Sequence, residues 1–176
     1  GTGVLLLPDE PTPPSAAATT STTQDLDSAV RRAEAHLSRV PGDWPAWAAL
    51  GMTRLELARI TAHPAHLPLA ETAFRRSLEV RPTGNAPALT GLGARAAARH
   101  EFRDALRHAR RAVAADAWSA DAYGVLTDAN TELGRYRQAR TAAVRMTELR
   151  PDTGSLGRLS YLAELAGETG RAKSLM

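Results

Sequence analysis

Residues 132–139, ELGRYRQA, interrupt a run of good helix formers with a glycine and follow it with a tyrosine and an alanine. A glycine inside a helix costs about 1 kcal/mol relative to alanine, so Gly134 is expected to end one helix just before the next begins. Residues 98–105, ARHEFRDA, place an aromatic residue and an alanine at the corresponding positions earlier in the chain. The interruption is therefore periodic.

The same interval separates other pairs of residues along the chain. It is about 34 residues from Ala105 to Ala139, from Leu92 to Leu126 and from Arg111 to Arg145, and one residue shorter from Ala139 to Ala172. The earlier intervals from Ala29 to Ala70 and from Pro41 to Pro82 are longer and equal to each other, which the insertion TAHPAHLP at residues 61–68 explains. Agreement at this many positions indicates an internal repeat.

The composition favours helices. Hydrophobic residues make up 43% of the 176 residues but aromatic residues only 5%, and alanine and leucine, which prefer helices to strands, supply most of the difference. This length suits one domain with a substantial core. Lys173 is the only lysine among 22 basic residues, an arginine bias that, with the abundant alanine, is typical of GC-rich bacterial genomes such as those of actinobacteria. An all-α fold is expected.

Hydrophobic spacing and helix breakers divide the chain into an arm and a helical domain. Residues 1–24 are expected to form an extended arm or linker, because they are rich in Pro, Ala, Ser and Thr from residue 8 onward and lack hydrophobic periodicity. The helical domain, residues 25–176, begins with a capping helix over residues 25–40. Four helix pairs follow, over about 43–82, 86–117, 120–151 and 154–176, and the last is cut off at Met176.

A helix-turn-helix unit that repeats about every 34 residues resembles the tetratricopeptide repeat. The resemblance rests on Trp47-x-x-Leu50-Gly51, on Ala70-x-x-x-Phe74 followed by Pro82, and on Leu133-Gly134-x-Tyr136-x-x-Ala139 followed by Pro151. It covers residues 25–176 and departs from the family pattern at Arg54, His100 and Ala117. It implies a right-handed α-solenoid of antiparallel helix pairs whose concave groove binds a partner peptide or helix.

The repeat also gives the opening stretch a physical explanation. Gly134 supplies the left-handed backbone that stops the first helix of a pair, and Tyr136 is expected to fill the wedge at the turn. Ala139 is small, so that two helices can approach closely. Replacing Ala139 with leucine is expected to overpack this contact by about 1 to 3 kcal/mol.

The register of the repeat places one set of side chains on the concave face. These residues are Ala48, Met52, Leu55, Glu56, Thr90, Ala94, Asp121, Gly124, Asp128, Thr131, Glu132 and Arg158. The groove is expected to be apolar at one end and acidic near Asp128 and Glu132, which suits a protein partner with apolar side chains and a basic residue. A clamp for a partner's C-terminal carboxylate is not expected, because the inner face has few basic residues. In the simpler alternative, Asp128 and Glu132 are merely solvated.

Six arginines on the second helices of the pairs could form a stripe on the convex side. They are Arg75, Arg76, Arg110, Arg111, Arg140 and Arg145. Such a stripe could bind nucleic acid or anionic lipid. Surface pairing is the favoured alternative, because Glu71 and Arg75 have i,i+4 spacing and the net charge is only +3. No aromatic stacking platform is evident, so a nucleic acid partner is not expected.

The sequence indicates no catalytic or metal site. His63 and His66 lie in the insertion without a third ligand nearby, so loop histidines are expected there. No hydrolase, metalloprotease or phosphate-binding motif occurs. We therefore expect a protein-interaction scaffold, without cofactor and without enzymatic activity. The alternative is a regulatory or accessory domain of a larger enzyme or transcription regulator.

The arm contains one apolar run, VLLL at residues 4–7. It is far too short to span a bilayer, although it could be the end of a signal or membrane segment upstream of residue 1, which would tether the domain. A second hypothesis is that Val4 to Leu7 dock in the groove of the same or a neighbouring chain, which would allow self-association. Lattice contacts alone are the simpler alternative.

Overall fold

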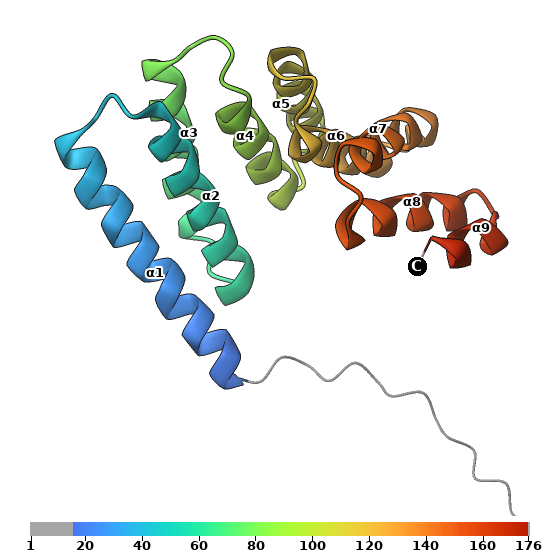
Figure 1. Cartoon of the computed structure of the whole chain (residues 1–176), viewed down its shortest axis with the longest axis horizontal. Helices are drawn as coiled ribbons and strands as arrows, with labels where there is room; N and C mark the ends of the chain where they lie inside the picture. Colours follow the sequence, from blue (N-terminus) through green and yellow to red (C-terminus); the bar gives the residue numbers. More distant parts are fainter. Residues whose placement is uncertain (1–15, 176) are drawn as a thin grey trace, which may run out of the picture.

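The computed structural model describes residues 16–175, and this part of the chain forms nine helices (Figure 1). They are α1 (Ala16–Arg39), α2 (Trp44–Thr61), α3 (His66–Val80), α4 (Ala86–Ala98), α5 (Phe102–Ala115), α6 (Ala120–Glu132), α7 (Tyr136–Leu149), α8 (Thr153–Leu165) and α9 (Thr169–Ser174). No strand occurs among the described residues. The expected all-α fold is confirmed. The apolar run at residues 4–7 lies outside the described residues.

The helices form consecutive pairs that stack side by side into an arch (Figure 1). The pairs are α2 with α3, α4 with α5, α6 with α7 and α8 with α9, while α1 packs against α2. The first helices of neighbouring pairs contact one another, from α2 to α4, α6 and α8, whereas α3, α5 and α7 do not. The first helices therefore form the inner side of the arch and the second helices the outer side.

Polar caps fix where the first helix of each pair begins. The side chains of Asp43, Asn85, Ser119 and Asp152 each accept a hydrogen bond from the backbone N–H three residues further on. Such a bond satisfies one of the backbone donors that a helix start leaves free. Asp43 is the cap of α2, and Pro45 follows it in the first turn of that helix.

A left-handed residue ends the first helix of each pair. The φ angle is 60° at His100, 69° at Gly134 and 76° at Gly167, so the left-handed backbone predicted for Gly134 is present. In the first pair Ala62 takes the same conformation, with φ of 52°. Histidine is one of the residues that tolerate positive φ, which explains why glycine can be absent at position 100.

Two boundaries differ from the sequence expectations. Helix α1 begins at Ala16, so residues 16–24, expected to belong to the arm, are helical. Alanine, which occupies positions 16–18, has the highest helix propensity of any residue type. These alanines extend a helix whose later residues are stabilised by packing against α2. The insertion at residues 61–68 is also mostly helical, because α2 continues to Thr61 and α3 begins at His66, so that only residues 62–65 form the connection.

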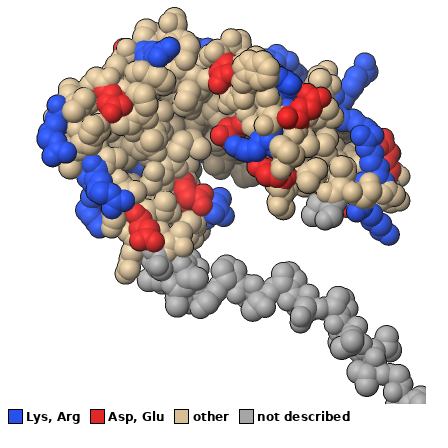
Figure 2. All heavy atoms as spheres, viewed as in Figure 1, with Lys and Arg blue, Asp and Glu red and all other residues tan. Residues whose placement is uncertain are grey.

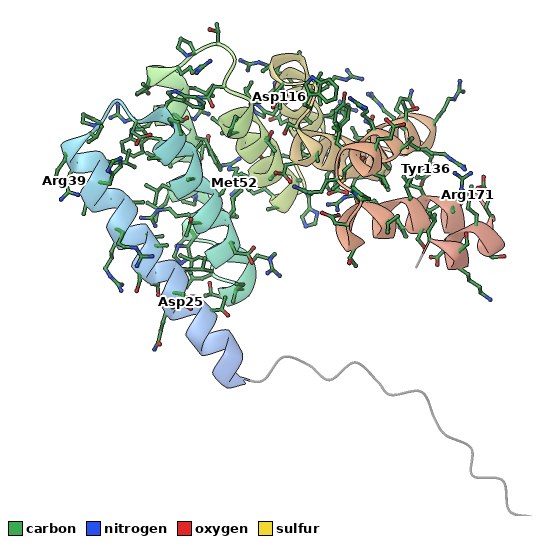
Figure 3. The ribbon with its side chains drawn as sticks, in the orientation of Figure 1. Asp25, Arg39, Met52, Asp116, Tyr136 and Arg171 are labelled. Atoms are coloured by element: carbon green, nitrogen blue, oxygen red, sulfur yellow. The ribbon has the colours of Figure 1, made fainter. Side chains whose placement is uncertain are left out.

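The core consists largely of alanine and leucine, with one buried phenylalanine. The side chains of Phe74 and Ala139 are both fully buried, and Ala139 lies where α7 meets α8. Tyr136, in contrast, is 51% exposed at the start of α7 and does not fill the wedge expected of it (Figure 3). None of the described helices is long and apolar enough to cross a membrane.

Candidate partner-binding groove

The inner side of the arch carries a continuous groove made of two adjoining hollows. The larger has a volume of about 730 Å³ and the smaller about 330 Å³. Met52 and Ala94 line both hollows, so the two meet at the face between α2 and α4. Met52 points from α2 toward this face and is 43% exposed (Figure 3). The space-filling view shows the molecule hollowed beneath the arch (Figure 2).

The larger hollow is mostly apolar. Its wall combines Leu26 of α1, Leu55 of α2 and Leu67 of α3 with alanines of α2 and α4. The polar side chains of the wall are Thr53 and the ion pair of Glu56 and Arg59, whose charged groups lie 2.5 Å apart. The hydrogen bond from Arg59 lowers the pKa of Glu56. This end of the groove is therefore an apolar surface, with Glu56 and Arg59 neutralising each other's charge in its wall.

The smaller hollow has an apolar floor and charged walls. Gly124 and Val125 of α6 and Met146 of α7 form part of the floor. A Cβ atom on Gly124 would lie 3.4 Å from Cε of Met146, so the absence of a side chain leaves room for this methionine. Thr90 lies in the wall, 5% exposed, and its buried Oγ1 has no hydrogen-bond partner among the described residues. Threonine can both donate and accept a hydrogen bond, and this oxygen does neither among the described residues.

Two arginines neutralise the acidic residues of this hollow. Arg158 of α8 binds Asp128 of α6 with both Nε and Nη2, each at 2.7 Å. Arg150 binds Asp121 at 2.6 Å and Asp152 at 2.7 Å. The hydrogen bond to Asp128 raises the pKa of the Arg158 guanidinium. The charged wall therefore consists of paired acids and arginines, and the expectation of an acidic end near Asp128 is wrong.

The structure brings most of the predicted groove residues together. Nine of the twelve line the two hollows, namely Met52, Leu55, Glu56, Thr90, Ala94, Asp121, Gly124, Asp128 and Arg158. Ala48 is a correction, because it is 2% exposed and packs against Ala70 and Phe74 in the core. Thr131 and Glu132 lie outside both walls, at the end of α6 where the helix leaves the groove.

Sequence reasoning missed several wall residues. Arg150 and Asp152 lie in the connection between α7 and α8, and Met146 reaches the floor from α7, a second helix. Leu26 belongs to the capping helix, which had been assigned only a covering role. The cap signature of Asp152 was detectable, but its pairing with Arg150 depends on how the connection folds.

The arginines of the convex side are largely paired. Arg75 binds Glu71 and Arg76 binds Glu79, both at 2.7 Å. Arg140 binds Glu168 at 2.8 Å, and Arg145 binds Glu148 at 3.0 Å. Only Arg110 and Arg111 of the six lack an ion-pair partner among the described residues. A continuous stripe of free positive charge is therefore not present on these helices.

The two histidines of the insertion do not form a metal site with their surroundings. Their ring centres lie 5.8 Å apart. No group of three or more potential ligands for a metal ion occurs among residues 16–175. The assignment of both histidines to a loop is wrong for His66, because it is the first residue of α3.

No protein-family model and no curated protein sequence matches the chain. Solved structures with a similar fold include MamA, with a TM-score of 0.62 at 21% identity over 92% of this chain and 90% of that one. MamA 41-end from Desulfovibrio magneticus RS-1 gives a TM-score of 0.64 at 18% identity, over 91% and 90% of the two chains. YrrB, described as a TPR protein with an unusual peptide-binding site, gives 0.55 at 15% identity, over 88% and 76%. At these identities the likeness concerns the fold.

Proposed function

We propose that this chain, which has the fold of the tetratricopeptide-repeat (TPR) proteins, binds a segment of a partner protein in its concave groove. The observation that carries the proposal is that side chains of α2, α4, α6 and α8, from four separate helix pairs, line one continuous hollow. A scaffold that holds this surface open before binding loses little conformational freedom when a partner arrives.

The two ends of the groove suit different parts of a bound segment. The larger hollow offers apolar surface around Leu55 and Leu67, which suits leucine-like or aromatic side chains. The smaller hollow offers the Arg158–Asp128 pair, whose side chains are partly exposed and can form further hydrogen bonds. A peptide or helix with apolar anchors at one end and polar groups at the other would match both.

The ion pair of Asp128 and Arg158 changes which charged residues a partner needs. Because Asp128 is already bound by Arg158, a basic residue of the partner would have to displace that arginine or share the carboxylate with it. A partner whose polar groups hydrogen-bond to the exposed atoms of Asp128 and Arg158, and leave the ion pair intact, avoids the cost of breaking it. Apolar contact in the larger hollow then supplies most of the affinity, because hydrophobic burial is the dominant favourable contribution to association.

Photocrosslinking tests this proposal directly. A benzophenone amino acid would replace Met52, which is exposed in the groove, and in a matched protein Arg103, which is exposed on α5 outside both hollows. Crosslinking in lysate of the source cells is expected to yield a discrete partner from position 52 and not from position 103. Equal crosslinking from the two positions would count against the groove.

Two substitution variants separate binding from folding. Met52→Asp places a charge on an exposed groove position, so it is expected to abolish capture of the partner while leaving the helical circular dichroism signal unchanged. The exchange of Asp128→Arg together with Arg158→Asp keeps an ion pair between α6 and α8. Capture by this swapped protein shows whether the partner depends on the direction of the pair, and retention of capture by Met52→Asp would contradict the proposal.

A further inference from the structure

A second open hollow lies on the convex side, between α5 and α7. These two helices do not contact each other, but both pack on α6, which forms the floor between them. The hollow has a volume of about 560 Å³. Its wall consists of Arg110, Tyr123, Leu126, Asn130, Gln138, Thr141, Ala142, Val144, Arg145 and Glu148. We refer to this set of residues as the α5–α7 trough.

In the corresponding troughs earlier in the chain, an arginine of the floor helix forms ion pairs with the walls. Arg54 of α2 binds Glu34 of α1. In the next unit, Arg95 of α4 binds Glu71 of α3 at 2.5 Å and Glu101, just before α5, at 2.8 Å. Arg54 and Arg95 are separated by the longer interval of the first repeat, and one repeat beyond Arg95 the chain has Ala129. The arginine that pairs with the walls of the earlier troughs is therefore missing from α6.

The floor of the trough carries a buried acceptor with no partner. Asn130 is 3% exposed, and its Nδ2 donates to the carbonyl oxygen of Leu126 at 2.8 Å. Its Oδ1 is buried and has no hydrogen-bond partner among the described residues. Buried polar groups are almost always hydrogen-bonded, so this oxygen has capacity for one donor, which a water or a molecule bound in the hollow would supply.

An exposed aromatic residue lies beside the trough. Trp118 is 75% exposed, and the guanidinium of Arg145 lies 5.1 Å from the centre of its ring. Arg145 also lines the trough and binds Glu148 at 3.0 Å. Tryptophan, tyrosine and arginine are the residues that most often dominate binding energy at protein interfaces, and Trp118, Tyr123 and Arg145 bring all three together here.

The two helices that flank the trough are basic, and Arg110 and Arg145 are the arginines that line it. Helix α5 carries four arginines and one acidic residue, and α7 carries three arginines and one acidic residue. Both acidic residues are already paired, Asp104 with Arg107 and Glu148 with Arg145. Arg110, which lines the trough, has no ion-pair partner in the described part of the chain. The charge of these walls is complementary to an acidic ligand.

We propose that the α5–α7 trough binds an acidic peptide segment of a partner protein, at a site separate from the concave groove. An apolar side chain of the segment enters between Tyr123, Leu126 and Val144. A carboxylate of the segment pairs with Arg110, and a backbone N–H donates to Oδ1 of Asn130. Trp118 covers the bound segment from the side. Nucleic acid is the less suitable occupant, because the apolar side chains of the hollow make no favourable contact with a phosphate backbone.

Selection from a phage-displayed library of random dodecapeptides tests this proposal. The intact chain serves as bait, and the variant Arg110→Glu serves for counter-selection. We expect enriched peptides in which one large apolar residue is flanked by aspartate or glutamate. Binding of an enriched peptide is expected to shift Trp118 fluorescence and to weaken at least tenfold in Arg110→Glu. It should be unchanged in the matched variant Arg103→Glu, on the same helix but outside the wall, and in the groove variant Met52→Asp.

Three results would overturn the proposal. The first is that no enriched peptide discriminates Arg110→Glu from Arg103→Glu. The second is enrichment of basic or uncharged sequences. The third is that a single-stranded oligouridine binds with the same Arg110 dependence while no acidic peptide does, which would identify the surface as a phosphate-binding face. Circular dichroism of both variants shows whether they are folded, and Val144→Asp, at an exposed wall position, provides a second variant if Arg110→Glu does not fold.

Discussion

The ring of Phe74 occupies the space in which a Cβ atom on Gly91 would lie. A Cβ built on Gly91 would approach three ring atoms of Phe74 to within 3.0 Å, and a Cβ on Gly51 would meet the same ring within the same limit. The ring belongs to α3, Gly51 to α2 and Gly91 to α4. One aromatic side chain thus joins two consecutive helix pairs, and the glycines are required for space and not for backbone flexibility.

Replacing Gly91 with alanine is therefore expected to destabilise the fold. Overpacking costs about 1 to 3 kcal/mol, and the better helix propensity of alanine recovers about 1 kcal/mol of it, so a net loss of up to about 2 kcal/mol is expected. Urea unfolding followed by circular dichroism measures it. Gly157→Ala is the control, because Gly157 lies in α8 with no atom within 4 Å of a built Cβ, and it should be neutral or stabilising. If the two variants are equally stable, the Phe74 contact does not restrict position 91.

Gly134 is required for the opposite reason: its backbone conformation restricts the residue type, whereas the space around it does not. Its φ is 69°, and nothing lies within 4 Å of a built Cβ. Gly134→Val is expected to lose about 1 to 2 kcal/mol in stability, the cost of a left-handed conformation for a residue with a Cβ. Gly134→Asn should lose clearly less, because asparagine tolerates this region as His100 does at the preceding turn. Thermal unfolding measures the stability of the two variants. Equal losses of stability would mean that side-chain contacts, and not the φ angle, determine which residues position 134 accepts.

The helix pairs could be predicted from the sequence because their signals are local. The break at Gly134 depends on a few neighbouring residues and the repeat interval on matching residue types along the chain, and the helices of the structure agree with both. The start of α1 could not be predicted in this way. Serine, threonine and alanine around residues 16–24 suit both a linker and the extension of a helix, and only the continuing helix decides between them.

The groove was predicted less completely, since its chemistry depends on contacts between units. Repeat register places Asp128 and Arg158 on the same face, but not within a bidentate contact between neighbouring units. Register alone also cannot separate Ala48, buried under the neighbouring helices, from Met52, one turn further and exposed. The α5–α7 trough was missed for a related reason, because an arginine that is absent from a repeat leaves no positive signal in the sequence.

His108 makes stability depend on pH. It is half-buried on α5, and its Nδ1 has no hydrogen-bond partner among the described residues. Burial, with the nearby Arg107, Arg111 and Arg75, lowers its pKa from the ordinary 6.5 despite the opposing effect of Asp104. The unfolded chain therefore takes up a proton first as the pH falls, so the contribution of His108 to stability is complete above about pH 6.5 and declines below it.

The variant His108→Gln is accordingly expected to have a flatter stability profile than the parent protein between about pH 7 and pH 5. Chemical unfolding at several pH values measures the slope. A parent slope that persists in His108→Gln would assign the pH dependence to other groups.

The bidentate pair of Arg158 and Asp128 is expected to couple α8 to α6 with modest strength. The side chain of Arg158 is 33% exposed and that of Asp128 45%, so solvent screens their attraction. A double-mutant cycle with Asp128→Asn and Arg158→Gln should give a coupling of about 0.5 to 1 kcal/mol, decreasing between about 0.1 and 1 M salt. Since α8 packs on α6, α7 and α9 and does not contact α4, Arg158→Gln should lower hydrogen-exchange protection in α8 and α9 and leave α4 unchanged. A coupling of zero, or one insensitive to salt, would show that packing alone holds the last pair in place.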